Sequence, residues 1–301
     1  MGIIVENLTK YYGKQAAVKR LSFDVKKVEI LGFLGPNGAG KTTSLKMIAG
    51  RMTPDDGVVR YGDLNINEHP KEARRYIGYL PESNPLYLNL YVREALRFYA
   101  DLHGVKQAKS RIEEIIEMTG LSREAHKQVR MLSKGYRQRL GIGISILHDP
   151  QIIILDEPIS GLDPNQLADI RRLIRQLSVE KTIIFSSHIL SEVEQVCDRI
   201  LVIHQGTLRA LDTVEALQGQ LSGQQVIEAE LDREIDLARL QSVEGVASWE
   251  GLGGNRVRIL AQPGKDIRAS WYEWTVREKV ILLESRVAPA SMEKIFEKLT
   301  E

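Results

Sequence analysis

Cysteine is almost missing from this chain of 301 residues, in which Cys197 stands alone. One cysteine cannot form an intramolecular disulfide, so the composition favours a reducing compartment. The start, MGIIVENLTKYYGK, lacks the basic region and the long apolar region of a signal peptide. The chain also lacks any apolar run near the roughly 18–20 residues that a membrane-spanning helix needs. These absences predict a cytoplasmic protein that reaches a membrane only through a partner.

An excess of charge of either sign is missing too. Lys and Arg number 41 and Asp and Glu number 40, which leaves a formal net charge of +1. Such a balance provides no general attraction to nucleic acid or to anionic lipid, so we expect no nucleic-acid partner. Hydrophobic residues make up 43% of the chain, which is ordinary for a globular protein with a real core. The length predicts one large and one small domain, at roughly 150 residues per domain.

The sequence GPNGAGKT, residues 35–42, matches the phosphate-binding pattern G-x-x-x-x-G-K-[ST]. A predicted strand (28–34) precedes it and a predicted helix (43–49) follows it, which is the required context. Its glycines let successive N–H groups face one anion at the positive end of the helix. Because Lys41 can reach the outer phosphates and Thr42 can hold Mg²⁺, the sequence predicts a nucleoside triphosphate site. The loop residues predicted to line it are Gly35, Asn37, Gly38, Ala39, Gly40, Lys41 and Thr42.

Two carboxylates follow an apolar stretch at 152–155, in the sequence IIILDEP. Asp156, at the end of this predicted strand, can hold Mg²⁺ through water. Glu157, one step on, can polarise the attacking water as a general base. A strand that simply ends in solvated acids is the common alternative, but the apolar run and Pro158 favour the catalytic interpretation.

The order of predicted elements indicates two domains. Residues 1–217 predict an α/β nucleotide-binding domain with helices inserted at about 83–150. A Gln-, Gly- and Ser-rich stretch at 217–225 is typical of a linker. Residues 218–301 predict the order β-α-β-β-α-β and a terminal helix, which suggests a small ferredoxin-like α+β domain without a ligand site. The apolar positions predicted for the terminal helix are Met292, Ile295, Phe296 and Leu299.

A third stretch, LSKGYRQR at 132–139, opens a predicted helix, where the Ser133 hydroxyl and the Gly135 N–H could bind an anion. The order GPNGAGKT, LSKGYRQR, IIILDEP, SGLD and SSHILSEVEQVCDRILVIHQG resembles the ATP-binding subunits of ABC transporters. The resemblance covers roughly residues 1–215, and LSKGY stands where that family has its LSGGQ signature. The segments IGYLPE, NPLY and YVREAL, with the small C-terminal domain, further resemble ATPases of drug-, polysaccharide- or gliding-associated export permeases.

The resemblance implies a phosphate-loop ABC ATPase fold that hydrolyses ATP with Mg²⁺, and it implies roles for matching positions. Tyr12 is expected to stack on the adenine, with Val18 packed beside it. Asp156 and Glu157 keep the metal and general-base roles, and His188 is expected to contact the γ-phosphate. The expected contacts with the phosphates and Mg²⁺ are Lys41, Thr42 and Thr43.

The resemblance also implies partners. Ser133 and Gly135 are expected to meet the ATP held by a second ATP-binding subunit, and Asp163 in SGLD is expected to lie near that interface. A homodimer is compatible with the single set of motifs. The subunit would drive export through a separate integral-membrane permease when the dimer closes on ATP, and would lie on the inner face of the cell membrane.

Three positions depart from the family pattern. Glu82 stands where the family usually has Gln, so it keeps an oxygen for Mg²⁺ but adds a negative charge. Lys134 and Tyr136 replace the first Gly and the Gln of the signature. Since Ser133 and Gly135 remain, the resemblance still implies a competent signature.

The loop after Glu82, residues 84–88, contains several apolar residues that we expect to be exposed. We expect Leu86 and Tyr87, with the predicted helix at 92–99, to line a groove for a short helix of the permease. Packing of these side chains under the inserted helices is the alternative.

A soluble ABC ATPase that acts on nucleic acid or ribosomes is the alternative function. About 90 residues separate Thr42 from Leu132, without cysteines or sustained heptads, which argues against zinc modules and long coiled coils. The chain carries one cassette, whereas translation-associated members usually carry two. We therefore favour the transport ATPase.

Overall fold

A computed structural model of the chain describes residues 1–221, 225–262, 264–288, 296, 299 and 300. The chain divides into two compact units: unit 1 is Met1–Asp212, and unit 2 begins at Thr213. The sequence predicts this boundary after residue 217, within a linker at 217–225. A helix, α8 (Val214–Leu221), instead occupies the start of that stretch. The Glu, Ala and Leu residues of α8 are good helix formers, so the segment is helical although its composition is rich in Gln, Gly and Ser.

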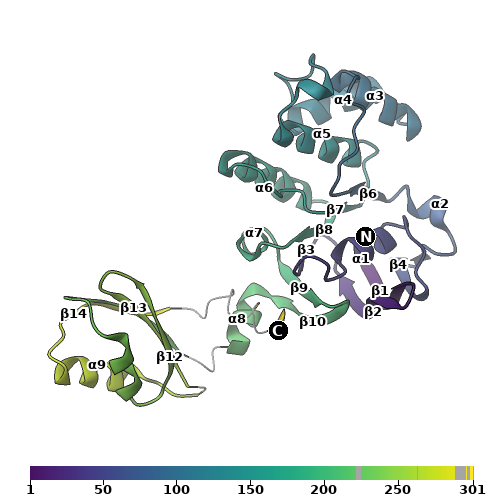
Figure 1. The fold of residues 1–301 in the computed structure, drawn as a ribbon. Helices are drawn as coiled ribbons and strands as arrows, with labels where there is room; N and C mark the ends of the chain where they lie inside the picture. Colours follow the sequence, from purple (N-terminus) through teal and green to yellow (C-terminus); the bar gives the residue numbers. More distant parts are fainter. Residues whose placement is uncertain (222–224, 263, 289–295, 297–298, 301) are drawn as a thin grey trace. The chain divides into compact units, whose positions relative to one another are not determined.

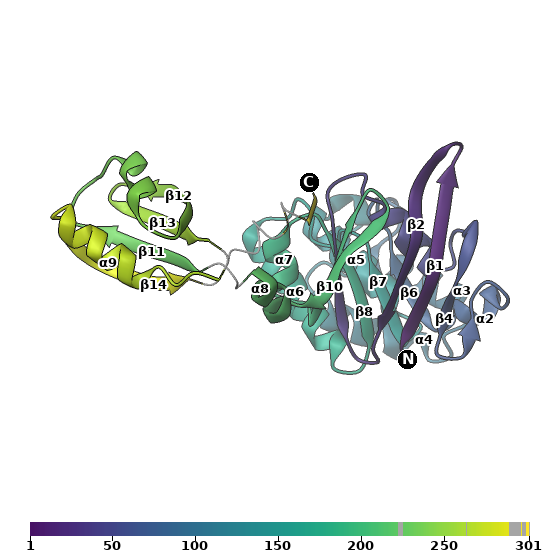
Figure 2. The same ribbon diagram turned by 90° about the horizontal axis from the view of Figure 1, so that it is seen from below.

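Unit 1 contains two sheets. The first, in the order β2-β1-β4-β5, joins neighbouring strands that are all antiparallel. Its strands are β1 (Ile3–Tyr12), β2 (Gln15–Val25), β4 (Asp56–Tyr61) and β5 (Leu64–Asn65). Figure 2 shows the length of the ribbon that β1 and β2 form.

The second sheet of unit 1 has the order β10-β9-β3-β8-β7-β6, and its strands from β9 to β6 are parallel. All residues of β3, β7 and β8 are buried, as expected of parallel strands covered on both faces. The strands are β3 (Ile30–Leu34), β6 (Ile77–Leu80), β7 (Ile152–Leu155), β8 (Thr182–Ser187), β9 (Arg199–His204) and β10 (Thr207–Thr213).

The helix α1 (Lys41–Ile48) connects the cores of these sheets. Its Leu45 and Met47 are fully buried in one apolar cluster with residues of β1, β2, β3 and β4. In that cluster the rings of Phe23 and Phe33 meet edge to face, with centroids 5.8 Å apart. This packing holds the first turn of α1 directly after β3, which positions the phosphate-binding loop.

The helices between β6 and β7 gather in one group, of which α5 packs against β6 and β7 (Figure 1). Each of α3 and α4 buries one apolar stripe, such as Ile112, Ile115 and Ile116 of α4. The helices α1, α6 and α7 follow the parallel strands β3, β7 and β8, whereas α2 lies between β5 and β6. The helices of unit 1 are α2 (Pro70–Ala73), α3 (Val92–Leu102), α4 (Ala108–Met118), the 3-10 helix η1 (Val129–Met131), α5 (Lys134–Ile146), α6 (Pro164–Ser178) and α7 (Leu190–Glu194).

Unit 2 contains an antiparallel sheet in the order β12-β13-β11-β14, which is the ferredoxin-like order. The stacked rings of Trp271 and Trp274, with centroids 5.4 Å apart, fill its core. A short 3-10 helix stands where the sequence predicts the first α-helix. The predicted terminal helix lies mostly outside the described residues. The elements are β11 (Val226–Leu231), η2 (Leu237–Ser242), β12 (Val246–Gly253), β13 (Arg256–Ala261), α9 (Arg268–Arg277) and β14 (Leu282–Ala288).

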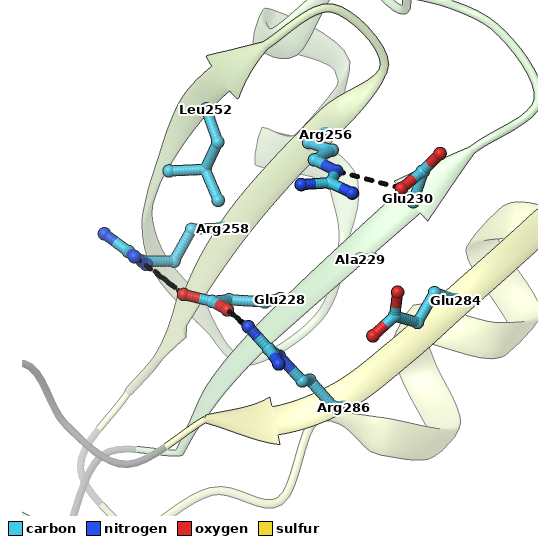
Figure 3. Close-up of a pocket in the computed structure, with 8 residues that line it drawn as sticks. All are labelled: Glu228, Ala229, Glu230, Leu252, Arg256, Arg258, Glu284 and Arg286. Carbon is cyan, nitrogen blue, oxygen red and sulfur yellow. Dashed lines mark hydrogen bonds and ion pairs between the residues drawn. The ribbon is translucent and has the colours of Figure 1, made fainter.

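Charged pairs line a cavity of about 370 Å³ on the sheet of unit 2 (Figure 3). Glu228 accepts hydrogen bonds from Arg258 (2.6 Å) and Arg286 (2.7 Å), which lower the pKa of its carboxyl group. Arg256 pairs with Glu230 at 2.8 Å. Because these charges satisfy one another across neighbouring strands, the cavity is explained as a solvated sheet face.

The architecture predicted from the sequence is confirmed: an α/β core with inserted helices and a small α+β C-terminal unit. Among the described residues, no helix combines the length and apolarity needed to cross a membrane.

Candidate nucleotide site

The loop between β3 and α1 is shaped to receive an anion. Gly38 and Gly40 have φ values of +80° and +105°, which favour glycine. A Cβ atom on Gly40 would lie 2.5 Å from the carbonyl oxygen of Ala17, so a side chain does not fit there. The first turn of α1 contains no acidic residue and no side-chain cap. Its N–H groups are therefore available to phosphate oxygens.

Lys41 lies folded over this loop, and its side chain is 6% exposed. Its Nζ donates hydrogen bonds to the carbonyl oxygens of Gly35 (2.7 Å) and Pro36 (3.3 Å). The same atom lies 3.4 Å from Oε1 of Glu157. The loop thus holds an ammonium group beside the predicted general base, where a phosphate would also be neutralised.

Asp156, directly after β7, is fully buried and incompletely paired. Its Oδ1 accepts hydrogen bonds from Ser186 Oγ (2.8 Å) and Thr42 Oγ1 (3.3 Å). Among the residues that the structure describes, its Oδ2 has no hydrogen-bond partner. Burial is the main reason why the pKa of this carboxyl group is raised. A cation would satisfy the orphan oxygen and favour the ionised form.

Glu157 has a strained backbone with φ +50°, and it is only 8% exposed. Its N–H donates to Ser186 Oγ at 2.9 Å, which ties the turn to β8. Its Oε2 lies 2.9 Å from Nδ1 of His188. Lys41 and His188 therefore approach the two carboxylate oxygens of Glu157 separately.

A cavity of about 360 Å³ lies above these groups. Its size falls within the usual range for small-molecule sites. Eight of its nine lining residues are predicted site residues, and Ala17 is the exception. The nine are Ala17, Asn37, Gly38, Gly40, Lys41, Thr42, Thr43, Glu82 and Glu157.

The oxygen atoms near this cavity fit Mg²⁺ when nucleotide phosphates complete the set. Thr42 and Asp156 are in contact, and Glu82 lines the same cavity. Mg²⁺ is commonly held by one or two carboxylates together with substrate phosphates. Within the described part of the chain, no three His, Cys, Asp or Glu side chains are arranged to hold a metal by themselves.

Several predicted site residues do not line this cavity. Tyr12 is 52% exposed, and Val18 is fully buried behind Gly40. Ser133 and Asp163 cap helices instead, accepting from the N–H groups of Tyr136 (3.4 Å) and Gln166 (3.0 Å). The predicted set of Ser133, Gly135 and Asp163 is therefore not joined to the phosphate loop within one chain.

Three polar residues of this region were missed by the sequence analysis. Ser186 connects Asp156 with the backbone of Glu157, as described above. Ser187 donates to Glu192 Oε2 at 2.6 Å, and burial raises the pKa of Glu192. The signal was present as two serines directly before His188, at the end of an otherwise apolar buried strand.

Known proteins resemble this chain in both sequence and structure. The family model described as "ABC transporter" matches residues 18–160. The linearmycin resistance ATP-binding protein LnrL of Bacillus subtilis (strain 168) is 33% identical over 98% of this chain and 97% of its own. The bacitracin transport ATP-binding protein BcrA of Bacillus licheniformis is 45% identical over 67% of this chain and 66% of its own.

Two solved structures give the same result for the fold. An ATP-binding subunit of an ABC transporter has a TM-score of 0.67 and 29% identity, covering 74% of this chain and 94% of that one. A bacterial ABC transporter cassette solved as a dimer has a TM-score of 0.65 and 25% identity, covering 70% and 98%. Together with the phosphate loop and its facing carboxylates, these likenesses show that the chain belongs to the ATP-binding, ATP-hydrolysing subunits of ABC transporters.

Proposed function

We propose that Glu157 is the general base for hydrolysis of ATP bound at the phosphate loop, with His188 orienting its carboxylate. The convergence of Lys41 and His188 on Glu157, at 3.4 and 2.9 Å, is the observation that carries this proposal. Glu157 would accept a proton from water as the water attacks the γ-phosphate, which releases ADP and phosphate. When ATP binds, before this step, Lys41 would turn from Glu157 towards the phosphates.

Mg²⁺, held by Thr42, Asp156 and Glu82, would neutralise the charge that develops on the phosphates. Asp156 supports this role because its Oδ2 is buried and finds no hydrogen-bond partner within the described ranges. Ser186 would keep Oδ1 in place through its 2.8 Å hydrogen bond. Tyr12 and Val18 would hold the base of the nucleotide, at the side of the loop where Val18 lies.

Glu157→Gln tests this assignment. Loss of the base should slow hydrolysis by roughly 10²–10⁴ while nucleotide binding remains. Hydrolysis is measured as phosphate release, and binding as the ATP-dependent shift in melting temperature. Glu180→Gln, an exposed position in the turn after α6, is the matched control and should keep the parent rate. A Glu157→Gln variant with the parent rate would move the base elsewhere.

The second half of each active site would come from a second copy of the chain. Ser133 and Gly135 lie at the start of α5, whose first turn contains no acidic residue. Such a helix start can meet a phosphate, yet it does not line the cavity of its own chain. The dimeric form of a solved relative is consistent with this arrangement. Asp163 would lie at the same interface.

A separate membrane permease would bind the inserted helices. Tyr87 is 55% exposed, and Leu86 is half-buried at the wall of a small cavity. The alternative that both side chains pack under these helices does not describe Tyr87. The relatives named for linearmycin resistance and bacitracin transport support export of an antibiotic-like molecule. The chain would then lie on the inner face of the cell membrane through its permease.

Replacement of both Leu86 and Tyr87 by Ser tests permease binding. The double variant should lose most of its recovery with membranes, because two apolar contacts are removed from the proposed surface. Sedimentation with vesicles measures recovery, and the melting temperature confirms folding. Leu252→Ser, an exposed apolar position on unit 2, is the control. Equal recovery of the double variant and the parent would place the permease surface elsewhere.

Export itself is tested by growth on linearmycin or bacitracin with the parent or with Glu157→Gln.

A further inference from the structure

A second, smaller cavity of about 170 Å³ lies in unit 1, where β6 meets α3, α5 and the loop after β6. Sites for drug-sized ligands usually measure about 300–1,000 Å³, so this cavity suits one side chain rather than a nucleotide. The residues that define its chemistry are Arg51, Tyr79, Leu86, Tyr99, His103 and His148.

Arg51 is the only Lys, Arg, Asp or Glu residue in the lining, which the structure describes completely. Its guanidinium group lies over the ring of Tyr79, 5.5 Å from the centroid. In the described part of the chain, no carboxylate forms an ion pair with Arg51. Stacking on an aromatic ring orients a guanidinium group but leaves its N–H donors available.

His103 and His148 stack face to face beside Arg51, with ring centroids 4.2 Å apart and planes 4° apart. His148 Nε2 lies 3.0 Å from the carbonyl oxygen of Ile77, which assigns the proton to that nitrogen. Burial lowers the pKa of His148 to about 4, and burial and Arg51 lower that of His103. Both rings are therefore neutral at physiological pH, and the positive charge of the cavity belongs to Arg51.

An apolar surface continues from this cavity along α3. The ring of Tyr99 lines the cavity and contacts Phe98, with centroids 5.3 Å apart, and Tyr87 contacts Phe98 at 5.2 Å. Tyr87, Phe98 and Leu102 are 55%, 44% and 69% exposed. An exposed aromatic cluster beside an unpaired arginine is typical of a protein-binding surface with a polar anchor.

We propose that this cavity receives an aspartate or glutamate side chain of the permease, whose carboxylate binds Arg51 while the rest of its short helix covers Tyr87, Phe98 and Leu102. The inference rests on the proposed binding of a permease to the inserted helices. It adds the chemistry of recognition: one carboxylate, bound in a bidentate manner by the guanidinium group, within an otherwise apolar contact.

One short segment of the chain connects this cavity with the nucleotide cavity. Pro81 and Asn84 line it, whereas Glu82 between them lines the nucleotide cavity. Asn84 also donates a hydrogen bond to the carbonyl oxygen of Arg137 in α5 at 2.9 Å. A carboxylate bound at Arg51 would therefore contact the segment that carries Glu82 and is attached to the signature helix.

Cross-linking tests the proposal with the full chain and with vesicles from the cells that encode it. The variant Arg51→Lys introduces an amine, which a carbodiimide joins to a nearby carboxylate. We expect a cross-linked peptide that joins position 51 to an Asp or Glu of an integral membrane protein. Arg74→Lys, an exposed arginine of unit 1, is the matched control and should give no such product.

Charge reversal provides a second measurement. Arg51→Glu should reduce recovery with vesicles by roughly tenfold or more, because a carboxylate would then face another carboxylate. Arg74→Glu makes the same change in net charge and should recover like the parent. The melting temperature of each variant, with and without ATP, identifies any loss of folding.

Two results would overturn the proposal while leaving permease binding intact. One is parent-like recovery with no cross-link at position 51. The other is an equal loss for Arg51→Glu and Arg74→Glu, which would indicate bulk charge. Stabilisation of the parent but not of Arg51→Met by acetate alone, without a cross-link, would assign the cavity to a free anion instead. If the parent itself is not recovered with vesicles, permease binding and this inference both fail.

Discussion

At the scale of single residues, the site is organised by buried polar groups that are only partly satisfied. Glu157 is shared between Lys41 and His188, and one oxygen of Asp156 has no partner in the described part of the chain. A buried polar group without a hydrogen bond costs roughly 1–3 kcal/mol. Arrangements of this kind are stable when a ligand completes them, which is consistent with a site built for nucleotide and metal.

Lys41→Ala should remove nucleotide binding. The parent should be stabilised by about 2.7 kcal/mol when ATP with Mg²⁺ is present at 100 times its Kd. The variant should show no such shift, because the loop would lose its only ammonium group at the phosphates. Scanning calorimetry with and without nucleotide measures the difference. Lys46→Ala, later on the same helix and outside the cavity, should keep the shift. An unchanged shift in Lys41→Ala would contradict the assignment of the loop.

At the scale of elements, α5 connects three functions of unit 1. Its start carries Ser133 and Gly135, and its Gly141 contacts Asn84 so closely that a Cβ would collide with that side chain. Just after its end, His148 lines the same cavity as Arg51. Movement of α5 would therefore displace residues of the signature, of the loop after β6 and of the proposed permease surface.

The half-buried His148 should make unit 1 sensitive to acid. Burial lowers its pKa to about 4 in the folded chain, whereas an unperturbed histidine, as in the unfolded chain, has a pKa of 6.5. The unfolded chain therefore binds the proton more readily. The associated stability is complete above about pH 6.5 and is lost as the pH falls towards 4. Allowing for partial exposure, the loss should be on the order of 1–3 kcal/mol.

His148→Gln should remove this part of the acid sensitivity. Scanning calorimetry at pH 7 and pH 4.5 follows the transition that ATP shifts at pH 7, which identifies unit 1. The drop between the two pH values should be smaller in His148→Gln than in the parent. His69→Gln, at an exposed position, should behave like the parent. Equal drops in all three proteins would show that His148 is not the sensor.

At the scale of the whole molecule, two groups of predicted site residues do not meet in the part of the chain that the structure describes. The phosphate loop and Glu157 line one cavity, whereas Ser133 and Asp163 are helix caps that do not line it. Lys134 carries its charge close to Gly161 in the SGLD segment, so the signature and that segment form one surface. A second copy that presents this surface to the nucleotide would complete the site.

Mixing two inactive variants tests this arrangement. Lys41→Ala removes one half-site and Ser133→Asp the other, so a mixed dimer should regain one intact site. Ser133→Asp repels phosphate yet preserves the cap of α5, since Asp and Ser are similarly good N-caps. Phosphate release should be higher in the mixture than in either variant alone. Ser133→Arg provides a second, bulkier block. A mixture no more active than its components would refute completion across subunits.

Local patterns in the sequence were sufficient for much of this protein. The spacing of GPNGAGKT, the apolar run before Asp156 and the order of predicted elements depend on neighbouring residues, so they predicted the loop, the carboxylates and the inserted helices. The same kind of pattern failed at α8, where composition suggested a linker although the intrinsic preference of several residues is helical.

Only the tertiary structure decided which distant groups meet. Ser186 reaches Asp156 because β7 and β8 pair in parallel, and Arg51 meets Tyr79 and the two histidines because separate elements pack around β6. Contacts of this kind arise from strand pairing and packing between residues far apart in the chain, which no local periodicity records. The sequence by itself therefore determined the family and predicted the groups proposed to carry its chemistry, whereas the fold decided their partners and created the cavity at Arg51.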